Sequence, residues 1–124
     1  MVDKKDYTYT KNSSGDYRDT WRIFRIMSEF VEGYSFLSSL QKTITFMGSA
    51  RILPGTQMYE AAEQLSAQLG KAGYTIVTGG GPGIMEAGNK GAFEAGGESI
   101  GLNIQLPFEQ RVNQFVTKSA AFYY

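Results

Sequence analysis

Cysteine and histidine are both absent from the 124-residue sequence, and their absence narrows the chemistry that the chain can perform. Without cysteine there is no disulfide, no thiolate metal ligand and no thiol nucleophile. Without histidine there is no Ser-His-Asp or Cys-His catalytic arrangement. Carboxylates, lysine, arginine, tyrosine and water remain as groups that transfer protons or stabilise charge. We therefore expect neither a metal site nor a cofactor.

Net charge and long apolar runs are lacking as well. The 12 basic residues balance 12 acidic residues, so no long-range field would attract nucleic acid. No stretch approaches the roughly 18 apolar residues of a membrane-spanning helix, and residues 1–7 do not resemble a secretory signal. These features predict a cytoplasmic protein with neither nucleic acid nor membrane as a partner.

Glycine, in contrast, is abundant, and the five-residue segment 79–83, which directly follows a β-type segment, contains four glycines. Residues 74–78 (Tyr-Thr-Ile-Val-Thr) precede Gly79-Gly80-Gly81-Pro82-Gly83, and residues 86–95 have a helical pattern. A glycine turn between strand and helix allows close backbone approach, and free N–H groups at the helix start attract an anion, most favourably a phosphate. The alternative is that these glycines only form a turn.

Two common phosphate-binding motifs do not fit this loop. No Gly-Lys-Ser/Thr ends it, which excludes a Walker A motif, and the last glycine of the dinucleotide fingerprint would fall on Ile84. The loop is therefore expected to bind phosphate in some other structural context.

The rest of the chain alternates helical and β-type segments. Residues 1–18 predict a flexible arm, and 19–124 predict one domain that begins with an amphipathic helix capped by Asp19 or Thr20. Strands are expected over 43–48, 74–78 and 99–106, with a fourth beginning within 115–124. Strand starts about 25 to 31 residues apart favour right-handed βαβ crossovers. The predicted fold is α/β, a parallel sheet in βαβαβ order with an extra N-terminal helix.

Two predicted helices lie between these strands. The first begins after Thr56, ends at Gly73, and is expected to bury Met58, Ala61, Ala62, Leu65, Leu69 and Ala72. The second contains Gly88 and Gly91 in its interior, where each glycine costs roughly 1 kcal/mol relative to alanine. We expect these glycines to allow close packing of the helix against the sheet.

The carboxyl ends of parallel strands meet at one edge of a sheet, where ligands of such folds bind. Three predicted strand ends contribute candidate binding residues to this edge. These are Gly48, Ser49, Arg51, Gly79, Gly80, Gly81, Gly83, Ile84, Met85, Glu86 and Asn103.

Each polar candidate has a functional and a structural interpretation. Arg51 would pair with a phosphate, or be a solvated arginine of a turn. Glu86 would stabilise the helix start or hydrogen-bond a ribose, or act in catalysis; it and Glu109 are the only carboxylates near the predicted edge. Ser49 and Asn103 would contact ribose or base, or serve the turn and the strand end.

Three segments together resemble the LOG ("Lonely guy") family, long labelled possible lysine decarboxylases. They are Phe46-Met47-Gly48-Ser49-Ala50-Arg51, Val77 to Ala87 with Gly-Gly-Gly-Pro-Gly-Ile-Met-Glu-Ala, and Gly101 to Pro107 followed by Glu109-Gln110. The resemblance covers about residues 43–124, and the N-terminal helix is similar to that of the larger bacterial branch.

This resemblance implies a Rossmann-like homodimer that acts as a nucleoside 5′-monophosphate phosphoribohydrolase. Such enzymes split the bond between base and ribose 5-phosphate, and cytokinin ribotides are their best-known substrates. The decarboxylase label implies pyridoxal phosphate, for which the residues of this chain give no specific support.

The chain also departs from the LOG pattern. The second signature, Pro-Gly-Gly-x-Gly-Thr-x-x-Glu, is absent, and so is the Arg-Lys pair expected a few residues past Tyr124. Because the family's catalytic arginine and glutamate belong to those segments, the resemblance assigns no catalytic residue here. We expect the chain to correspond to the first half of such an enzyme. The alternatives are a nucleotide- or phosphate-binding module without chemistry, and a chain that self-associates as a dimer or larger assembly.

Overall fold

The computed structural model describes residues 16–105 and 111–123. Its elements are α1 (Asp16–Ser38), β1 (Thr43–Thr45), α2 (Gln57–Lys71), β2 (Thr75–Thr78), α3 (Ile84–Glu94), β3 (Ser99–Ile104) and β4 (Lys118–Phe122). The four strands form one sheet in the order β1-β2-β3-β4, and every neighbouring pair is parallel. The α/β class and the parallel sheet predicted from the sequence are thus confirmed.

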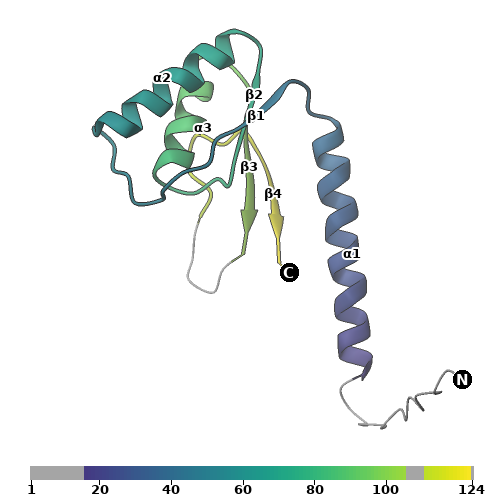
Figure 1. Cartoon of the computed structure of the whole chain (residues 1–124). Coiled ribbons are helices and arrows are strands. Elements are labelled where there is room, and N and C mark those ends of the chain that lie inside the picture. Colours follow the sequence, from purple (N-terminus) through teal and green to yellow (C-terminus); the bar gives the residue numbers. More distant parts are fainter. Residues whose placement is uncertain (1–15, 106–110, 124) are drawn as a thin grey trace, which may run out of the picture.

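Helices cover the two faces of this sheet unequally. Helices α2 and α3 lie side by side on one face, whereas α1 lies on the other side, beyond β4 (Figure 1). Because the strand order follows the sequence without reversal, both crossovers run in the same direction and place their helices on the same face. The core between sheet and helices is formed by Ile76, Ala87 and Ala92, all fully buried.

The first helix begins earlier than its capping residues predicted. We expected Asp19 or Thr20 as the N-cap, but α1 already includes Asp16. Neither glycine nor proline interrupts residues 16–19, so nothing in this stretch opposes helical backbone angles. Residues 1–15 of the predicted arm lie outside the described residues.

Helix α2 begins and ends as predicted but buries a different face. The Thr56 side chain caps it by accepting a hydrogen bond from the N–H group of Tyr59, and Gly73 follows it with a positive φ of 89°. The expected inner residues Met58 and Leu65 are 64% and 51% exposed, whereas Tyr59 and Ser66 are buried. Of the other expected residues, Ala61 and Ala72 are exposed, whereas Ala62 and Leu69 are half-buried. The buried face differs because Ser66 meets the glycine backbone of α3 and the Tyr59 hydroxyl reaches Glu86.

That surface belongs to α3. Ser66 donates its hydroxyl to the carbonyl of Gly88, and a Cβ atom on Gly91 would overlap the carbonyl oxygen of Glu63. Gly88 also packs on the ring of Phe46, directly after β1, at 3.1 Å from its would-be Cβ atom. The expected close contact with the sheet region therefore holds for Gly88. At Gly91 the close approach is to helix α2 instead.

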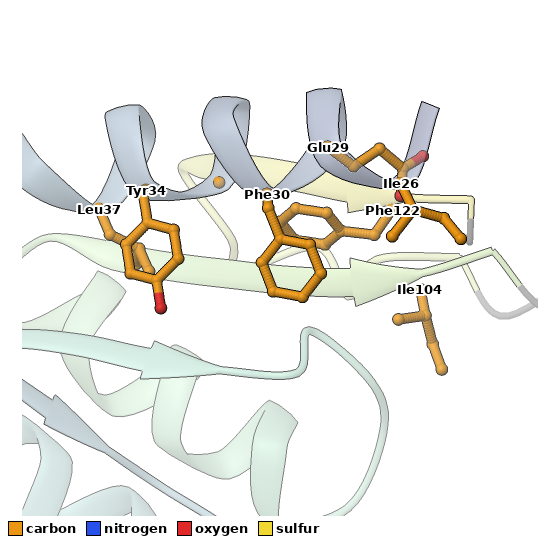
Figure 2. Close-up of a pocket in the computed structure, with 8 residues that line it drawn as sticks. Ile26, Glu29, Phe30, Tyr34, Leu37, Ile104 and Phe122 are labelled. Atoms are coloured by element: carbon orange, nitrogen blue, oxygen red, sulfur yellow. The ribbon is translucent and has the colours of Figure 1, made fainter. Parts of the chain in front are cut away.

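The opposite face of the sheet is covered only in part. Val77 and Ile100 on this face are buried, but Ile104 and Met47, nearer the carboxyl ends of the strands, are 55% and 88% exposed. Gly33 brings α1 close to the Phe122 ring. Phe30 and Tyr34 point from α1 toward the sheet (Figure 2). These side chains border an apolar hollow of about 390 Å³ between α1 and the ends of β3 and β4.

Candidate functional site

Direct backbone contacts join the turn that follows β1 to the start of α3, which follows β2 and the glycine loop. The N–H group of Ile84 donates to the carbonyl of Ser49 over 3.1 Å. Gly83, with φ of 73°, leaves no room for a Cβ atom because the backbone of Ser49 and Ala50 occupies that space. The turn after β1 and the start of α3 therefore form one rigid unit, as the predicted shared edge requires.

The glycine loop, residues 79–83, places an uncapped helix start at this edge. Gly83 is the N-cap of α3 and supplies no side-chain hydrogen bond, while the N–H group of Gly80 donates to Thr78 Oγ1 over 2.9 Å. Within residues 16–105 and 111–123, the N–H groups of Gly81, Met85 and Glu86 meet no protein acceptor. Free donors at a helix N-terminus are the arrangement that favours an anion.

Access to these donors is narrower than the sequence suggested. Gly80, Gly81 and Gly83 are buried, Gly79 is half-buried, and only Pro82 of the loop is exposed. The Met85 side chain lies over the loop, with its Sδ and Cε atoms 2.9 and 2.7 Å from the would-be Cβ atoms of Gly79 and Gly81. The Met85 side chain thus covers the loop at Gly79 and Gly81.

A hollow of about 290 Å³ lies next to the loop, over the carboxyl ends of β1, β2 and β3. Its lining is mainly apolar and consists of Thr45, Phe46, Met47, Gly48, Val77, Thr78, Gly79, Met85 and Leu102. Gly79 of the loop and Met85 of the first turn of α3 both line the hollow, so an apolar recess adjoins a cluster of backbone donors.

Glu86 is turned away from this hollow. Its Oε1 atom accepts a hydrogen bond of 2.8 Å from the hydroxyl of Tyr59, whose side chain is buried in α2. Burial, reinforced by the neighbouring Glu86 carboxylate, raises the pKa of the Tyr59 phenol. Lys90 lies 6.0 Å from the centre of the Tyr59 ring and pairs with Glu63 at 3.3 Å. In this arrangement Glu86 ties the start of α3 to α2.

The remaining polar candidates differ in their surroundings. Arg51 is exposed and forms no ion pair among the described residues. Ser49 accepts a hydrogen bond of 3.1 Å from the Arg51 N–H group, which is the turn role weighed against ligand contact. Asn103 is half-buried on the same face of β3 as Gly101. Glu109 lies outside the described residues.

Two asparagines that the sequence analysis did not single out organise this edge. Asn89, fully buried in α3, accepts from Thr78 Oγ1 over 2.5 Å and donates to Ser99 Oγ over 2.8 Å. Asn113 donates to Asn89 Oδ1 and to the carbonyl of Gly81, each over 3.0 Å. An asparagine inside the apolar pattern of 84–94 was the available signal for Asn89. No local pattern marked Asn113, whose partners are 24 and 32 residues away.

Two further findings concern the described residues alone. No group of three or more acidic side chains comes together there in a metal-binding arrangement. None of the helices in those residues has both the length and the apolar character needed to cross a membrane.

The family model described as LDcluster4, SLOG cluster4 family, matches residues 41–118, which include β1, β2, β3, their carboxyl ends and the first residue of β4. The chain belongs to the SLOG cluster4 family. This membership confirms the relationship to LOG proteins that the three sequence motifs predicted.

A solved structure supports the same fold for this SLOG cluster4 chain. The X-ray structure of TM1055, a structural genomics target, is similar with a TM-score of 0.50 and 26% sequence identity. The match covers 64% of this chain and 45% of TM1055, so the chain spans less than half the length of that protein. A search of curated proteins finds no match. The similarity to TM1055 confirms the Rossmann-like character of the parallel sheet.

Proposed function

We propose that this chain binds a nucleoside 5′-monophosphate at the carboxyl edge of its sheet, as the binding half of a phosphoribohydrolase-type site. The phosphate would meet the free N–H groups at the start of α3, and the base would enter the apolar hollow. The observation that carries this proposal is the contact between the two features, because Gly79 of the loop and Met85 of the first turn of α3 both line the hollow. Membership of the SLOG cluster4 family agrees with a nucleotide ligand.

Charge at this edge is consistent with a phosphate. Arg51 is exposed beside the loop without an ion-pair partner among the described residues. Glu86 would otherwise repel an anion, but it accepts its hydrogen bond from Tyr59 on the α2 side and does not line the hollow. The helix dipole of α3 and the Arg51 guanidinium would then both favour the bound phosphate.

Calorimetric titration of the 124-residue chain with AMP, adenosine and ribose 5-phosphate tests this proposal. We expect AMP to bind more tightly than either part alone, and its affinity to fall as salt is raised. Arg51→Ala should weaken AMP about tenfold and leave adenosine unchanged. Lys71→Ala, which removes an exposed positive charge at the far end of α2, is the matched control. Equal affinities for AMP and adenosine would contradict a phosphate site.

The same preparation tests the chemistry. LOG proteins place their catalytic arginine and glutamate in signatures that this sequence does not contain. We therefore expect the chain to bind AMP without releasing adenine. Base release by the chain, measured chromatographically and abolished by Gly81→Val, would instead assign a complete N-glycosidic hydrolase to these residues.

A further inference from the structure

Residues 111–117 form a segment, here named the strap, that lies across the glycine loop and β3. Val112 lies 3.5 Å from the would-be Cβ atom of Gly80, and Val116 lies 3.1 Å from that of Gly101. The ring centres of Phe115 and Phe93 are 6.0 Å apart. The strap is thus packed on both glycines, and at Gly101 a Cβ atom would meet Val116 in a tight contact.

Asn113 is the residue of the strap that holds the loop. Its N–H group donates to the carbonyl of Gly80 over 2.7 Å, and its Nδ2 atom donates to the carbonyl of Gly81 over 3.0 Å. The same Nδ2 atom donates to Asn89 Oδ1, and Asn113 Oδ1 accepts from the Phe115 N–H group over 3.1 Å. One residue therefore fixes two successive carbonyls of the loop and is itself fixed by α3 and by the strap.

These contacts determine where the loop donors point. In a trans peptide the C=O and N–H bonds are antiparallel, and no cis peptide occurs in the described chain. Since the Gly80 carbonyl faces Asn113, the N–H group of Gly81 in the same peptide unit faces away from the strap. The Gly81 carbonyl also faces Asn113, and the next residue, Pro82, has no N–H group. The orientation of the Gly81 donor is thus set before any ligand arrives.

We propose that Asn113 is the positioning residue of this site: it holds the glycine loop so that the Gly81 N–H group is oriented for a ligand phosphate. The inference rests on the proposed function, because the phosphate is the ligand it serves. It adds that strap and loop act as one unit, so that phosphate binding and strap docking support each other. A loop held in its bound form avoids the entropic cost of ordering it during binding.

The test compares Asn113→Ala with Gln114→Ala, a change at the neighbouring exposed residue of the strap. We expect Asn113→Ala to raise the Kd for AMP at least tenfold, with Gln114→Ala within twofold of the unmodified chain. In ¹⁵N-correlated NMR spectra without ligand, the Gly81 amide signal should move in Asn113→Ala and stay in place in Gln114→Ala. The signal of Ile76, buried in β2, should stay in place in both and thereby report an intact sheet.

A measurement on the unmodified chain covers the case in which Asn113→Ala does not fold. During AMP titration, the Asn113 side-chain amide signals should shift with the same concentration dependence as Gly81. The inference is overturned if those signals do not respond while AMP binds, or if a folded Asn113→Ala variant keeps AMP affinity within twofold. If the unmodified chain binds no AMP, the proposed function fails. The ligand-free Gly81 signal of Asn113→Ala then decides separately whether Asn113 sets the loop.

Discussion

Tyr59 of α2 connects its helix to the first turn of α3. It is 2% exposed, its hydroxyl donates to Glu86, and its ring lies under Lys90. From the sequence, the larger aliphatic residues of α2 are expected to be buried, and no protein partner is expected for Glu86. The hydrogen bond explains both differences, because burying a phenol requires an acceptor for its hydroxyl.

Replacing Tyr59 with phenylalanine should change stability in a pH-dependent manner. Near neutral pH, Tyr59→Phe is expected to lose about 1–2 kcal/mol, because Glu86 loses a buried donor. The phenol has a raised pKa in the folded state, so it contributes stability that is complete below about pH 10, the ordinary tyrosine pKa, and is lost as pH rises above that value. The variant should therefore lose stability less steeply than the unmodified chain above about pH 10.

Urea unfolding at a series of pH values from neutral to alkaline measures both effects. Tyr34→Phe is the matched control, since that side chain is 71% exposed. Parallel stability curves for the unmodified chain and Tyr59→Phe in the alkaline range would show that Tyr59 ionises as freely in the folded state as in the unfolded state.

At the scale of elements, the α2–α3 contact governs the position of the glycine loop. The backbones of the two helices approach closely where Ser66 of α2 meets Gly88 and Gly91 of α3. A Cβ atom on Gly91 would meet the α2 backbone itself, whereas one on Gly70 would lie 3.4 Å from the nearest atom, Ala92 Cα. The two glycines therefore look alike in sequence and differ in the space around them.

Alanine substitution should consequently have opposite effects at these positions. Gly91→Ala is expected to destabilise the chain by about 1–3 kcal/mol, because backbone must move to admit the methyl group. Gly70→Ala should stabilise it by up to about 1 kcal/mol through the higher helix propensity of alanine. Chemical denaturation of both variants, monitored by circular dichroism, measures the difference. Destabilisation of similar size in both would mean that α2 and α3 do not approach as closely as described.

The elements themselves could be predicted from sequence, whereas their contact surfaces could not. Strand composition, the Thr56 cap and the Gly73 stop act locally, so they are visible in a short window of sequence. The buried face of α2 depends on what α3 offers it, and Asn113 acts through partners distant in the chain. The position of the candidate site followed from parallel strand ends. That Met85 covers the glycine loop could be recognised only from the positions of its side-chain atoms in the structure.

At the scale of the whole molecule, α1 is the helix that makes the fewest contacts with the rest of the described chain. It touches the sheet at β4, through Gly33 and Phe122, and Glu29 accepts a hydrogen bond from the Tyr123 N–H group over 2.8 Å. Several of its large apolar side chains are more than half exposed. These are Trp21, Ile23, Phe24, Met27, Phe30, Val31 and Tyr34.

Such a surface on a helix favours self-association, and we expect the chain to form a dimer or larger assembly through α1. The double variant Met27→Glu, Val31→Glu should shift the sedimentation profile toward the monomer, because two carboxylates would enter the apolar contact. The control Ser28→Glu, Ser35→Glu adds the same charge at exposed polar positions of the same helix. An unmodified chain that sediments as a monomer at all concentrations tested would refute the expectation.

The unreversed order of the strands has a consequence for how the chain acquires its structure. Each strand pairs with its successor, and α2 packs on α3, so the sheet joins segments in the order in which a ribosome delivers them. A growing chain can add one βα unit at a time without waiting for a distant strand to insert between two earlier ones. The strap, which contacts the glycine loop through Val112 and Asn113, is synthesised after that loop and after β3. The glycine loop is therefore expected to reach its final shape only after residues 111–117 have been synthesised.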